Sequence, residues 1–419
     1  MKLESFLNII QKKFHIDIHY LLKNGTIISS SHAFGTLCGF LVSVLLANYI
    51  DSTTYGQYKY ILAVAGIISA FSLTGAASAV LQSVSKGFDG SLEYEKKLSA
   101  LWGTPAIIIS LFFGGYYIYN DNYVLGLGVI LMSTFVYLQN IFILHTSFLN
   151  GKKDFKNLAK NQVLSSITVV SSIACIIFFD ATSVFWILLA YNGSMTLYQY
   201  LAQKRTLRFY NPDKNSVDVS EQALSRHLSV GNIISVIAEY IDKILIFQFL
   251  GPYQLAIYAF SVGIPDQIRS INKLINSMVI PRLSTKNDAQ LAHSIKTHTR
   301  TYVIVTLVIT ILFWIIAKPL YSLLFPQYVE ASWYASIYIL ILPIIAAGIL
   351  HGNALQIQKK IKSLYSIRIF DSGLKIFFFV ILIPHYGVLG AILSILLSKG
   401  ATIILQMILF SRSEKDNSK

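Results

Sequence analysis

The chain has 419 residues, of which 54% are hydrophobic and 13% are charged, and its mean hydropathy is +0.58. This balance excludes an ordinary soluble domain and is typical of a protein that crosses a membrane several times. The formal net charge is +14, but the basic residues follow the membrane topology inferred below, so we do not interpret this charge as nucleic-acid binding.

The N-terminal segment, residues 1–22, contains charges that interrupt each of its apolar runs. This pattern argues against a cleavable signal peptide. It favours an amphipathic helix that lies at the cytoplasmic membrane interface. The first membrane span is therefore expected only after this segment.

Twelve apolar segments of about twenty residues follow, which is the length that a helix needs to cross a hydrocarbon core of about 30 Å. The predicted spans are 27–46, 60–81, 98–118, 123–146, 163–179, 184–201, 230–250, 255–280, 301–323, 333–355, 367–383 and 388–410. The sequence therefore predicts an all-α polytopic membrane protein with twelve transmembrane helices.

Lysine and arginine concentrate in the N-terminal segment, in every second loop and in the C-terminal tail. The short loops on the other side, such as 51–57 and 384–387, are nearly free of basic residues. Because loops rich in Lys and Arg stay in the cytoplasm, both termini are predicted to be cytoplasmic.

The spans divide into two groups of six. An ungapped offset that places Tyr58 on Tyr258 aligns 45–60 with 245–260, which favours two pseudo-symmetric six-helix lobes related by an axis along the membrane normal. The predicted divisions are the N-terminal segment 1–22, an N-lobe 23–202, a cytoplasmic linker 203–228, a C-lobe 229–411 and a tail 412–419.

The stretch 240–284 places charges where lipid is expected. Asp242 and Lys243 lie in one apolar span, and Asp266, Arg269 and Lys273 lie in the next. Ionisable groups at membrane depth are costly, so they usually face a protein or water-filled interior and mark a pathway. The alternative is that neighbouring acidic and basic residues only neutralise one another as structural ion pairs.

Further charges lie in other spans. Asp371 and Lys375 are four residues apart on one helix and are predicted to pair. Lys399 has no acidic residue in its own span, so we expect it to attract an anion from elsewhere. Lys59 is nearer to a membrane surface, where snorkelling is the alternative explanation.

Neither cysteine chemistry nor metal chemistry is indicated. Cys38 and Cys175 each lie in an apolar segment without a neighbouring cysteine, and no histidine cluster has metal-ligand spacing. The sequence predicts no metal site, no catalytic residue and no cofactor.

Several segments together resemble a known family. These are 49–58 (YIDSTTYGQY), 148–157 (FLNGKKDFKN), 240–260 (YIDKILIFQFLGPYQLAIYAF) and 279–284 (VIPRLS). Their order and spacing within twelve spans resemble the polysaccharide-unit flippases, the O-antigen or Wzx-type branch of the multidrug/oligosaccharidyl-lipid/polysaccharide (MOP) superfamily. The multidrug (MATE) exporters and the lipid II flippase belong to the same superfamily.

The resemblance implies a MATE-like, V-shaped pair of lobes around a cavity that opens alternately to the cytoplasm and the periplasm. The implied substrate is an undecaprenyl-pyrophosphate-linked oligosaccharide, flipped between leaflets of the bacterial inner membrane for O-antigen and lipopolysaccharide synthesis. The implied partners are membrane lipids, H⁺ or Na⁺ as coupling ions, and the polysaccharide polymerase machinery.

A pyrophosphate is at least a dianion, and cations in a low-dielectric cavity bind it strongly. The candidate ligands of this anion are Arg269, Lys375 and Lys399, followed by Lys243 and Lys59. The candidates for ion coupling or charge pairing are Asp242, Asp266, Asp371, Glu239 and His32.

Other classes of function remain as alternatives. A MATE-type multidrug or cation antiporter favours an acidic cavity, whereas the span charges here are basic in sum. A lipid II flippase would typically have fourteen spans. An integral-membrane polysaccharide enzyme usually needs a large catalytic loop or an acidic cluster, and a channel usually contains pore-loop motifs; none of these features is recognised.

Overall fold

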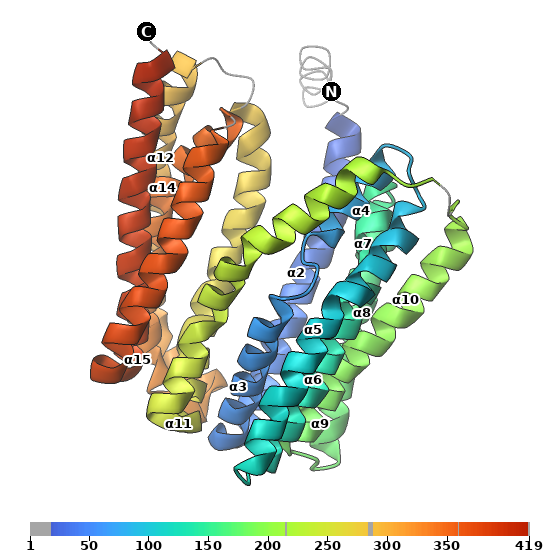
Figure 1. Ribbon diagram of the computed structural model, residues 1–419. Helices are drawn as coiled ribbons and strands as arrows, with labels where there is room; N and C mark the ends of the chain where they lie inside the picture. The colour runs from blue at the N-terminus through green and yellow to red at the C-terminus, as the bar shows by residue number, and fades with distance from the viewer. Residues whose placement is uncertain (1–17, 214–215, 284–287, 359, 418–419) are drawn as a thin grey trace, which may run out of the picture.

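The computed structural model describes residues 18–213, 216–283, 288–358 and 360–417, and in these ranges it is helical without a β-strand. The helices form two bodies, which we call the N-lobe (α2 to α10) and the C-lobe (α11 to α15) (Figure 1). Most of the predicted amphipathic N-terminal segment, residues 1–17, lies outside the described residues.

The N-lobe consists of helices that run up and down between two ends. They are α2 (Ile18–Tyr49), α3 (Ser52–Ser69), α4 (Ala76–Ser85), α5 (Ser91–Tyr119), α6 (Tyr123–Phe142), α7 (Leu144–Gly151), α8 (Phe155–Phe178), α9 (Val184–Leu188), the π-helical turn η1 (Leu189–Gly193) and α10 (Ser194–Tyr210). The predicted linker 203–228 stays a prediction, because α10 and α11 extend into it from both sides.

The C-lobe contains two helical hairpins and the helices between them. Its elements are α11 (Val219–Leu283), α12 (Asp288–Leu324), the 3₁₀ turn η2 (Pro326–Tyr328), α13 (Ala331–Tyr338), α14 (Ile341–Ile357) and α15 (Ile361–Asn417). Gly251 (φ 85°) turns α11 back on itself, and Gly387 (φ 58°) does the same in α15. Glycine accepts this left-handed conformation without steric cost, which confirms the two predicted turns.

Seven helical stretches within the described residues are long and apolar enough to cross a membrane by length and composition alone. They are Gly25–Tyr49, Ser91–Tyr119, Tyr123–Gly151, Phe155–Phe178, Thr297–Leu324, Ala331–Ile357 and Lys362–Ser413. The last of these contains two predicted spans joined at Gly387. The all-α membrane fold is confirmed, whereas the number twelve stays a prediction.

The second predicted span, 60–81, is wrong as a continuous helix. The helix α3 starts earlier, at Ser52, where the Asp51 side chain caps it by accepting a hydrogen bond from Thr54 N (2.9 Å). The helix then breaks between Ser69 and Ala76, and Gly75 N donates to Ser229 Oγ of α11 (2.9 Å). A tertiary contact that hydropathy does not reveal therefore interrupts this span.

The two lobes meet where α3 packs against α11. The first part of α11 stays packed on α4 of the N-lobe, whereas the rest of the C-lobe diverges from the N-lobe toward the upper end of Figure 1. At this seam a Cβ on Gly56 would lie 1.9 Å from the carbonyl oxygen of Pro252, so the two backbones touch. Tyr60 stacks on Phe247 with ring centroids 3.9 Å apart, and its hydroxyl accepts from Gln248 Nε2 (2.9 Å). The expected V-shaped arrangement is present, with its closed end at the bottom.

Aromatic rings from both lobes close the lower end. Tyr55 of α3 stacks on Phe260 of α11 (4.7 Å between centroids), and Phe260 contacts Tyr328 (4.1 Å) and Phe325 (5.3 Å). All four side chains are buried. We call these four residues the aromatic seal. Their packing buries apolar area between the lobes, which stabilises closure at this end.

At the upper end of the N-lobe, the Asp154 side chain joins the start of α8 to the end of α10. Asp154 caps α8 by accepting from Asn157 N (3.2 Å), and it also accepts from the hydroxyl of Tyr210 in α10 (2.6 Å). Burial alone would raise the pKa of the Asp154 carboxyl, but the hydrogen bonds from Tyr210 and Asn157 outweigh it and lower this pKa below its usual value.

Asp154→Ala should destabilise the protein by about 1–2 kcal/mol at pH 7, since it removes a helix cap and the acceptor of Tyr210. The folded-state pKa is lower than that of the unfolded chain, so this contribution is complete above the unfolded pKa and is lost as the pH falls through the folded one. Thermal unfolding of the wild type and the variant should therefore differ most near neutral pH and converge below about pH 4. A difference that does not depend on pH would contradict this assignment.

Candidate functional site

The predicted charged residues come together inside the protein from three elements. They lie on α3, on both limbs of α11 around Gly251, and on both limbs of α15 around Gly387. At 1.5 Å per residue, Asp242 lies about 14 Å from the Gly251 turn, and Lys375 lies about 18 Å from the Gly387 turn. The site therefore lies at membrane depth.

The first ion pair joins Asp242 and Lys243 (3.1 Å). Asp242 is 3% exposed, and it also accepts a hydrogen bond from the hydroxyl of Tyr258 (2.5 Å). Lys243 Nζ donates in addition to the backbone carbonyl of Glu239 (3.1 Å), whereas Glu239 itself is exposed. The hydrogen bond from Tyr258 and the ion pair thus hold Asp242 in place as the counter-ion of Lys243.

The second ion pair joins Asp266 and Arg269 (3.2 Å), as their spacing predicts. Tyr338 of α13 donates its hydroxyl to Asp266 Oδ1 (2.8 Å) and accepts from Arg269 Nη1 (3.4 Å). Both members of this pair are more than one third exposed. The side chain of Lys273 lies outside the described part of the chain.

The third ion pair corrects a prediction. Asp371 does not pair with Lys375 but with Lys399 on the other limb of α15 (2.6 Å), and it also accepts from Thr402 Oγ1 (3.0 Å). The expectation that Lys399 lacks an acidic partner is wrong, because the turn at Gly387 brings the two limbs together. A search within one span cannot find such a pair.

Two interior lysines have no ion pair or hydrogen bond among the described residues. Lys375 Nζ lies 5.3 Å from the ring centroid of Phe379, and Lys59 Nζ lies 5.1 Å from Tyr55 and 5.6 Å from Tyr58. Both ammonium groups are repelled by Lys243, and Lys375 is also attracted by the carboxylates of Asp242 and Asp371. Since Lys59 belongs to the N-lobe and the others to the C-lobe, like charges face each other between the lobes.

A sequence model described as "Polysaccharide biosynthesis protein" matches residues 21–286, more than half of the chain. The chain belongs to the polysaccharide biosynthesis protein family. No curated protein sequence matches it. The family assignment therefore rests on the sequence model, and it confirms the resemblance found in the motifs.

Solved structures show that this member of the polysaccharide biosynthesis protein family has the MOP superfamily fold. The lipid II flippase MurJ in an inward closed conformation is 12% identical with a TM-score of 0.69, covering 92% of this chain and 87% of its own. The MATE multidrug transporter DinF-BH is 11% identical with a TM-score of 0.66, covering 95% of this chain and 96% of its own.

A MOP superfamily transporter from Pyrococcus furiosus, described as having a binding pocket of reverse polarity, is 11% identical with a TM-score of 0.58, covering 96% of each chain. These structural relatives are transporters and flippases, not enzymes. At such low identity they establish the fold, and the function must be argued from the site.

One coupling candidate lies apart from this site. His32 is exposed on α2, and the described residues show no contact between its side chain and the charged cluster. Sequence reasoning also missed the hydroxyl donors Tyr258, Tyr338 and Thr402. Tyr258 could have been predicted from the sequence. It lies almost as many residues after the turn at Gly251 as Asp242 lies before it, so the two side chains are at a similar depth on the two limbs of α11.

Tyr258→Phe should destabilise this family member by about 1.5–3 kcal/mol, since it removes a hydrogen bond to a buried carboxylate. Tyr328→Phe is the matched control: Tyr328 is equally buried, but its hydroxyl has no hydrogen-bond partner among the described residues. Thermal unfolding in detergent should show a loss for the first variant and little change or a gain for the second. Equal losses would contradict the role of Tyr258.

Proposed function

We propose that this protein is a flippase for an undecaprenyl-pyrophosphate-linked oligosaccharide. It moves this repeat unit from the cytoplasmic to the periplasmic leaflet by alternating access, for the synthesis of O-antigen or a related surface polysaccharide. The family assignment supports the link to polysaccharides, and the MOP fold supports transport.

The observation that carries the proposal is the pair of interior lysines that form no ion pair within the described residues. Three ion pairs neutralise Lys243, Arg269 and Lys399, whereas Lys59 and Lys375 remain without an ion pair in the described structure. A half-buried ammonium without an acceptor is costly, so the site favours a ligand that supplies negative oxygens. A pyrophosphate group has that chemistry.

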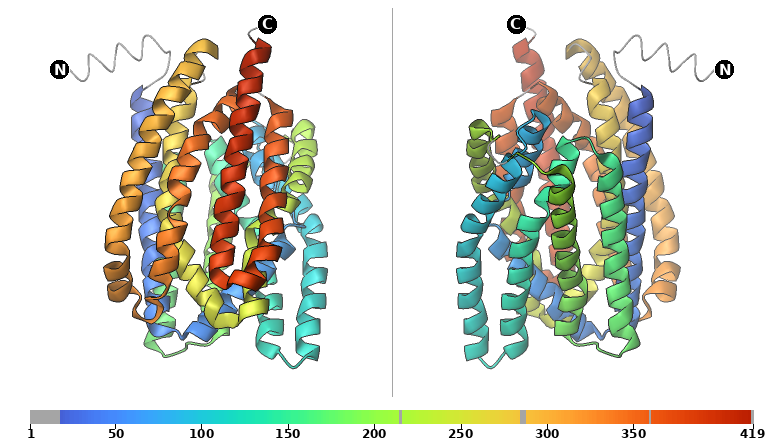
Figure 2. Two further views of the ribbon diagram at one scale, coloured as in Figure 1. Left: turned by 90° about the vertical axis from the view of Figure 1, so that its left-hand side faces the viewer. Right: turned by 90° about the vertical axis from the view of Figure 1, so that its right-hand side faces the viewer.

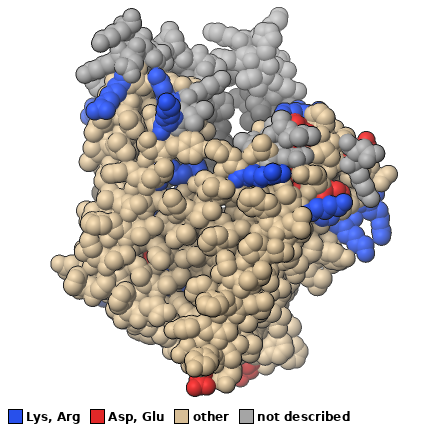
Figure 3. Space-filling view, viewed as in Figure 1, with Lys and Arg blue, Asp and Glu red and all other residues tan. Residues whose placement is uncertain are grey.

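The charge distribution supports an orientation with the upper end of Figure 1 in the cytoplasm. On the face drawn in Figure 3, lysine and arginine gather over the upper half together with a few acidic residues, while only acidic residues mark the lower tip. The described helical ends, Ile18 and Asn417, also lie at the upper end (Figures 1 and 2). By the positive-inside rule we assign both termini to the cytoplasm of a bacterial inner membrane.

This orientation gives each cation a place along the transport path. The lobes diverge at the upper end and are closed below by the aromatic seal, so the conformation faces the cytoplasm. Arg269 lies about 27 Å from the Gly251 turn, Lys375 about 18 Å from Gly387, and Lys243 about 12 Å from Gly251. The head group would meet Arg269 first and Lys59, beside the seal, last.

The aspartates most simply hold the cations in position. Asp242, Asp266 and Asp371 each form an ion pair with a lysine or arginine. We therefore assign charge pairing to them and expect coupling to H⁺ or Na⁺ to require that these pairs break. The polymerase machinery remains the expected partner on the periplasmic side.

The test is complementation of a strain that lacks its own repeat-unit flippase, with surface polysaccharide as the readout. Restored polymer, together with binding of inorganic pyrophosphate to the purified protein in nanodiscs, would support the proposal. The rival is a MATE-type cation antiporter, which the fold also permits. Greater tolerance of cationic drugs without restored polymer would replace the flippase assignment by this rival.

A further inference from the structure

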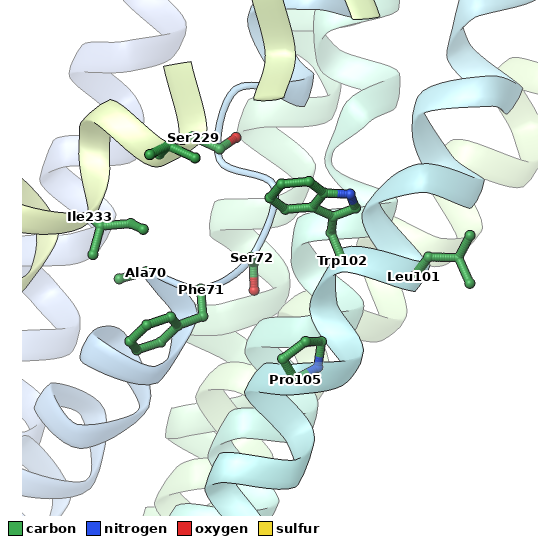
Figure 4. A pocket seen from close by; sticks show the side chains of 9 residues that line it. Ala70, Phe71, Ser72, Leu101, Trp102, Pro105, Ser229 and Ile233 are labelled. Carbon is green, nitrogen blue, oxygen red and sulfur yellow. The ribbon is translucent and has the colours of Figure 1, made fainter. Parts of the chain in front are cut away.

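A pocket of about 420 Å³ lies where the broken second span meets α5 and α11 (Figure 4). Trp102 and Pro105 reach it from α5, and Ser229 and Ile233 reach it from α11. The other lining residues are Ala70, Phe71, Ser72, Leu101 and Val230. The volume falls in the range of ligand sites, and the lining is mostly apolar with a few polar groups, as such sites usually are.

The pocket is open toward the lipid. Phe71 is 41% exposed, Leu101 is 68% exposed and Val230 is 59% exposed, so its outer rim continues the apolar surface that faces the membrane. Ser72 and Ser229 are the polar residues of the lining, and Ser229 Oγ is already hydrogen-bonded to Gly75 N and to the Ser225 carbonyl oxygen. An occupant from the bilayer would thus be apolar along the part that fills the pocket.

Two contacts next to the pocket hold α11 against the N-lobe. Glu95 of α5 accepts a hydrogen bond from Ser225 Oγ (3.1 Å), with both residues buried, and Gly75 N donates to Ser229 Oγ (2.9 Å). A Cβ on Gly75 would lie 2.2 Å from the carbonyl oxygen of Ser225. The pocket is therefore a built part of the junction between α11 and the N-lobe.

We propose that this pocket binds the isoprenoid units next to the phosphate of the substrate's polyprenyl chain, and so loads the substrate from the cytoplasmic leaflet. Arg226 lies one helical turn from Ser229 and Val230 on the same face of α11, and it is exposed. Its guanidinium would meet the phosphate while the chain fills the pocket. This inference rests on the proposed function.

The helix α11 connects the pocket to the interior cations. Ser229, Ile233, Val236, Tyr240 and Lys243 follow one another at spacings of four, three, four and three residues, so they lie on one helical face. The face is about 21 Å long. At Tyr240 this face packs against Gly66 of α3, so the face is closed in this conformation. A polyprenyl phosphate held at its upper end is placed to pass its head group toward Lys243 once α11 and α3 separate. This continuity favours the substrate's chain over an ordinary acyl chain.

The experiment uses Trp102 as the reporter in a full-length variant whose other tryptophans, Trp186, Trp314 and Trp333, are replaced by phenylalanine. In nanodiscs of phosphatidylcholine with brominated acyl chains, bromine in the pocket should quench the fluorescence of Trp102. Unbrominated undecaprenyl phosphate, added as a minor component, should then displace these chains and restore most of the fluorescence. Phosphatidic acid at the same amount should not.

The controls separate the possible occupants. Equal restoration by phosphatidic acid, no restoration by undecaprenyl phosphate, or no quenching at all would each overturn the proposal. Ala70→Leu should fill the pocket and abolish both quenching and restoration, whereas Ala33→Leu, at an exposed site on α2, should change neither.

The same variants distinguish this inference from the proposed function. Inorganic pyrophosphate has no chain, so Ala70→Leu should bind it as the wild type does. Selective restoration by undecaprenyl phosphate without pyrophosphate binding would contradict the proposed function alone. Pyrophosphate binding without selective restoration would contradict the pocket assignment alone.

Discussion

Replacing Lys375 with methionine is expected to make the protein more stable and to remove most of its affinity for pyrophosphate. The Lys375 ammonium has no ion pair or hydrogen bond among the described residues. It interacts at longer range with the carboxylates of Asp242 and Asp371 and with the cations Lys243 and Lys399. A methionine of similar length removes the cost of burying the charge and the repulsion from Lys243 and Lys399, which together outweigh the lost attraction to Asp242 and Asp371. Stability should therefore rise by about 1 kcal/mol. A charged residue that lowers the stability of the protein in this way usually serves function.

The lost charge also removes a charge-assisted contact to the anion, worth about 1.5–3 kcal/mol, so the affinity for inorganic pyrophosphate should fall by about tenfold or more. Lys399→Met is the matched control, because it leaves Asp371 without its cation and should lower stability by about 1–3 kcal/mol. Thermal unfolding and calorimetric titration measure both quantities. If Lys375→Met lowers stability or binds pyrophosphate normally, Lys375 is a structural residue.

Gly56→Ala is expected to open the lower end of the protein and to reduce transport by on the order of tenfold. The added Cβ would lie 1.9 Å from the Pro252 carbonyl oxygen, and the contact is to backbone, which cannot rotate away. Overpacking of this kind costs about 1–3 kcal/mol. The cost applies only while the lobes meet at this seam, so the equilibrium should shift toward conformations with an open lower end.

A cysteine at position 328, introduced after Cys38 and Cys175 are replaced by serine, would report the shift. Tyr328 is fully buried in the aromatic seal, so this cysteine should react slowly with a charged maleimide, and faster when Gly56 is alanine. Gly39→Ala, on α2, meets nothing within 4 Å and should leave both reactivity and transport unchanged. Equal reactivity in all three backgrounds would mean that the seam does not govern opening.

Local patterns in the sequence were enough for the all-α membrane class and for two of the ion pairs. Hydropathy predicted most of the helices and the short segments 251–254 and 384–387 between spans, because span length is a local property. The pairs at Asp242 and Asp266 were also predictable, since each partner lies within one helical turn.

The remaining features depend on contacts between distant segments. The partner of Asp371 lies 28 residues away, and the break after Ser69 depends on a contact with Ser229. A single sequence shows which residues can pair but not which limbs touch. For the same reason it could not distinguish Lys375, which has no ion pair in the described structure, from Lys399, which has one.

Lys59 and Lys375 are also expected to make the protein sensitive to membrane voltage. Lys59 and Lys375 give the empty site positive charge that no ion pair cancels in the described structure, and a bound pyrophosphate would offset it. A voltage that is negative in the cytoplasm favours positive charge on that side, by about 2.3 kcal/mol per elementary charge for each 100 mV crossed. With the upper end in the cytoplasm, the voltage would draw the empty, positively charged site back toward the cytoplasm. It would not oppose the outward movement of the loaded site, whose charge is offset by the pyrophosphate. A voltage step applied without substrate should therefore produce a transient current that disappears when both lysines are neutralised.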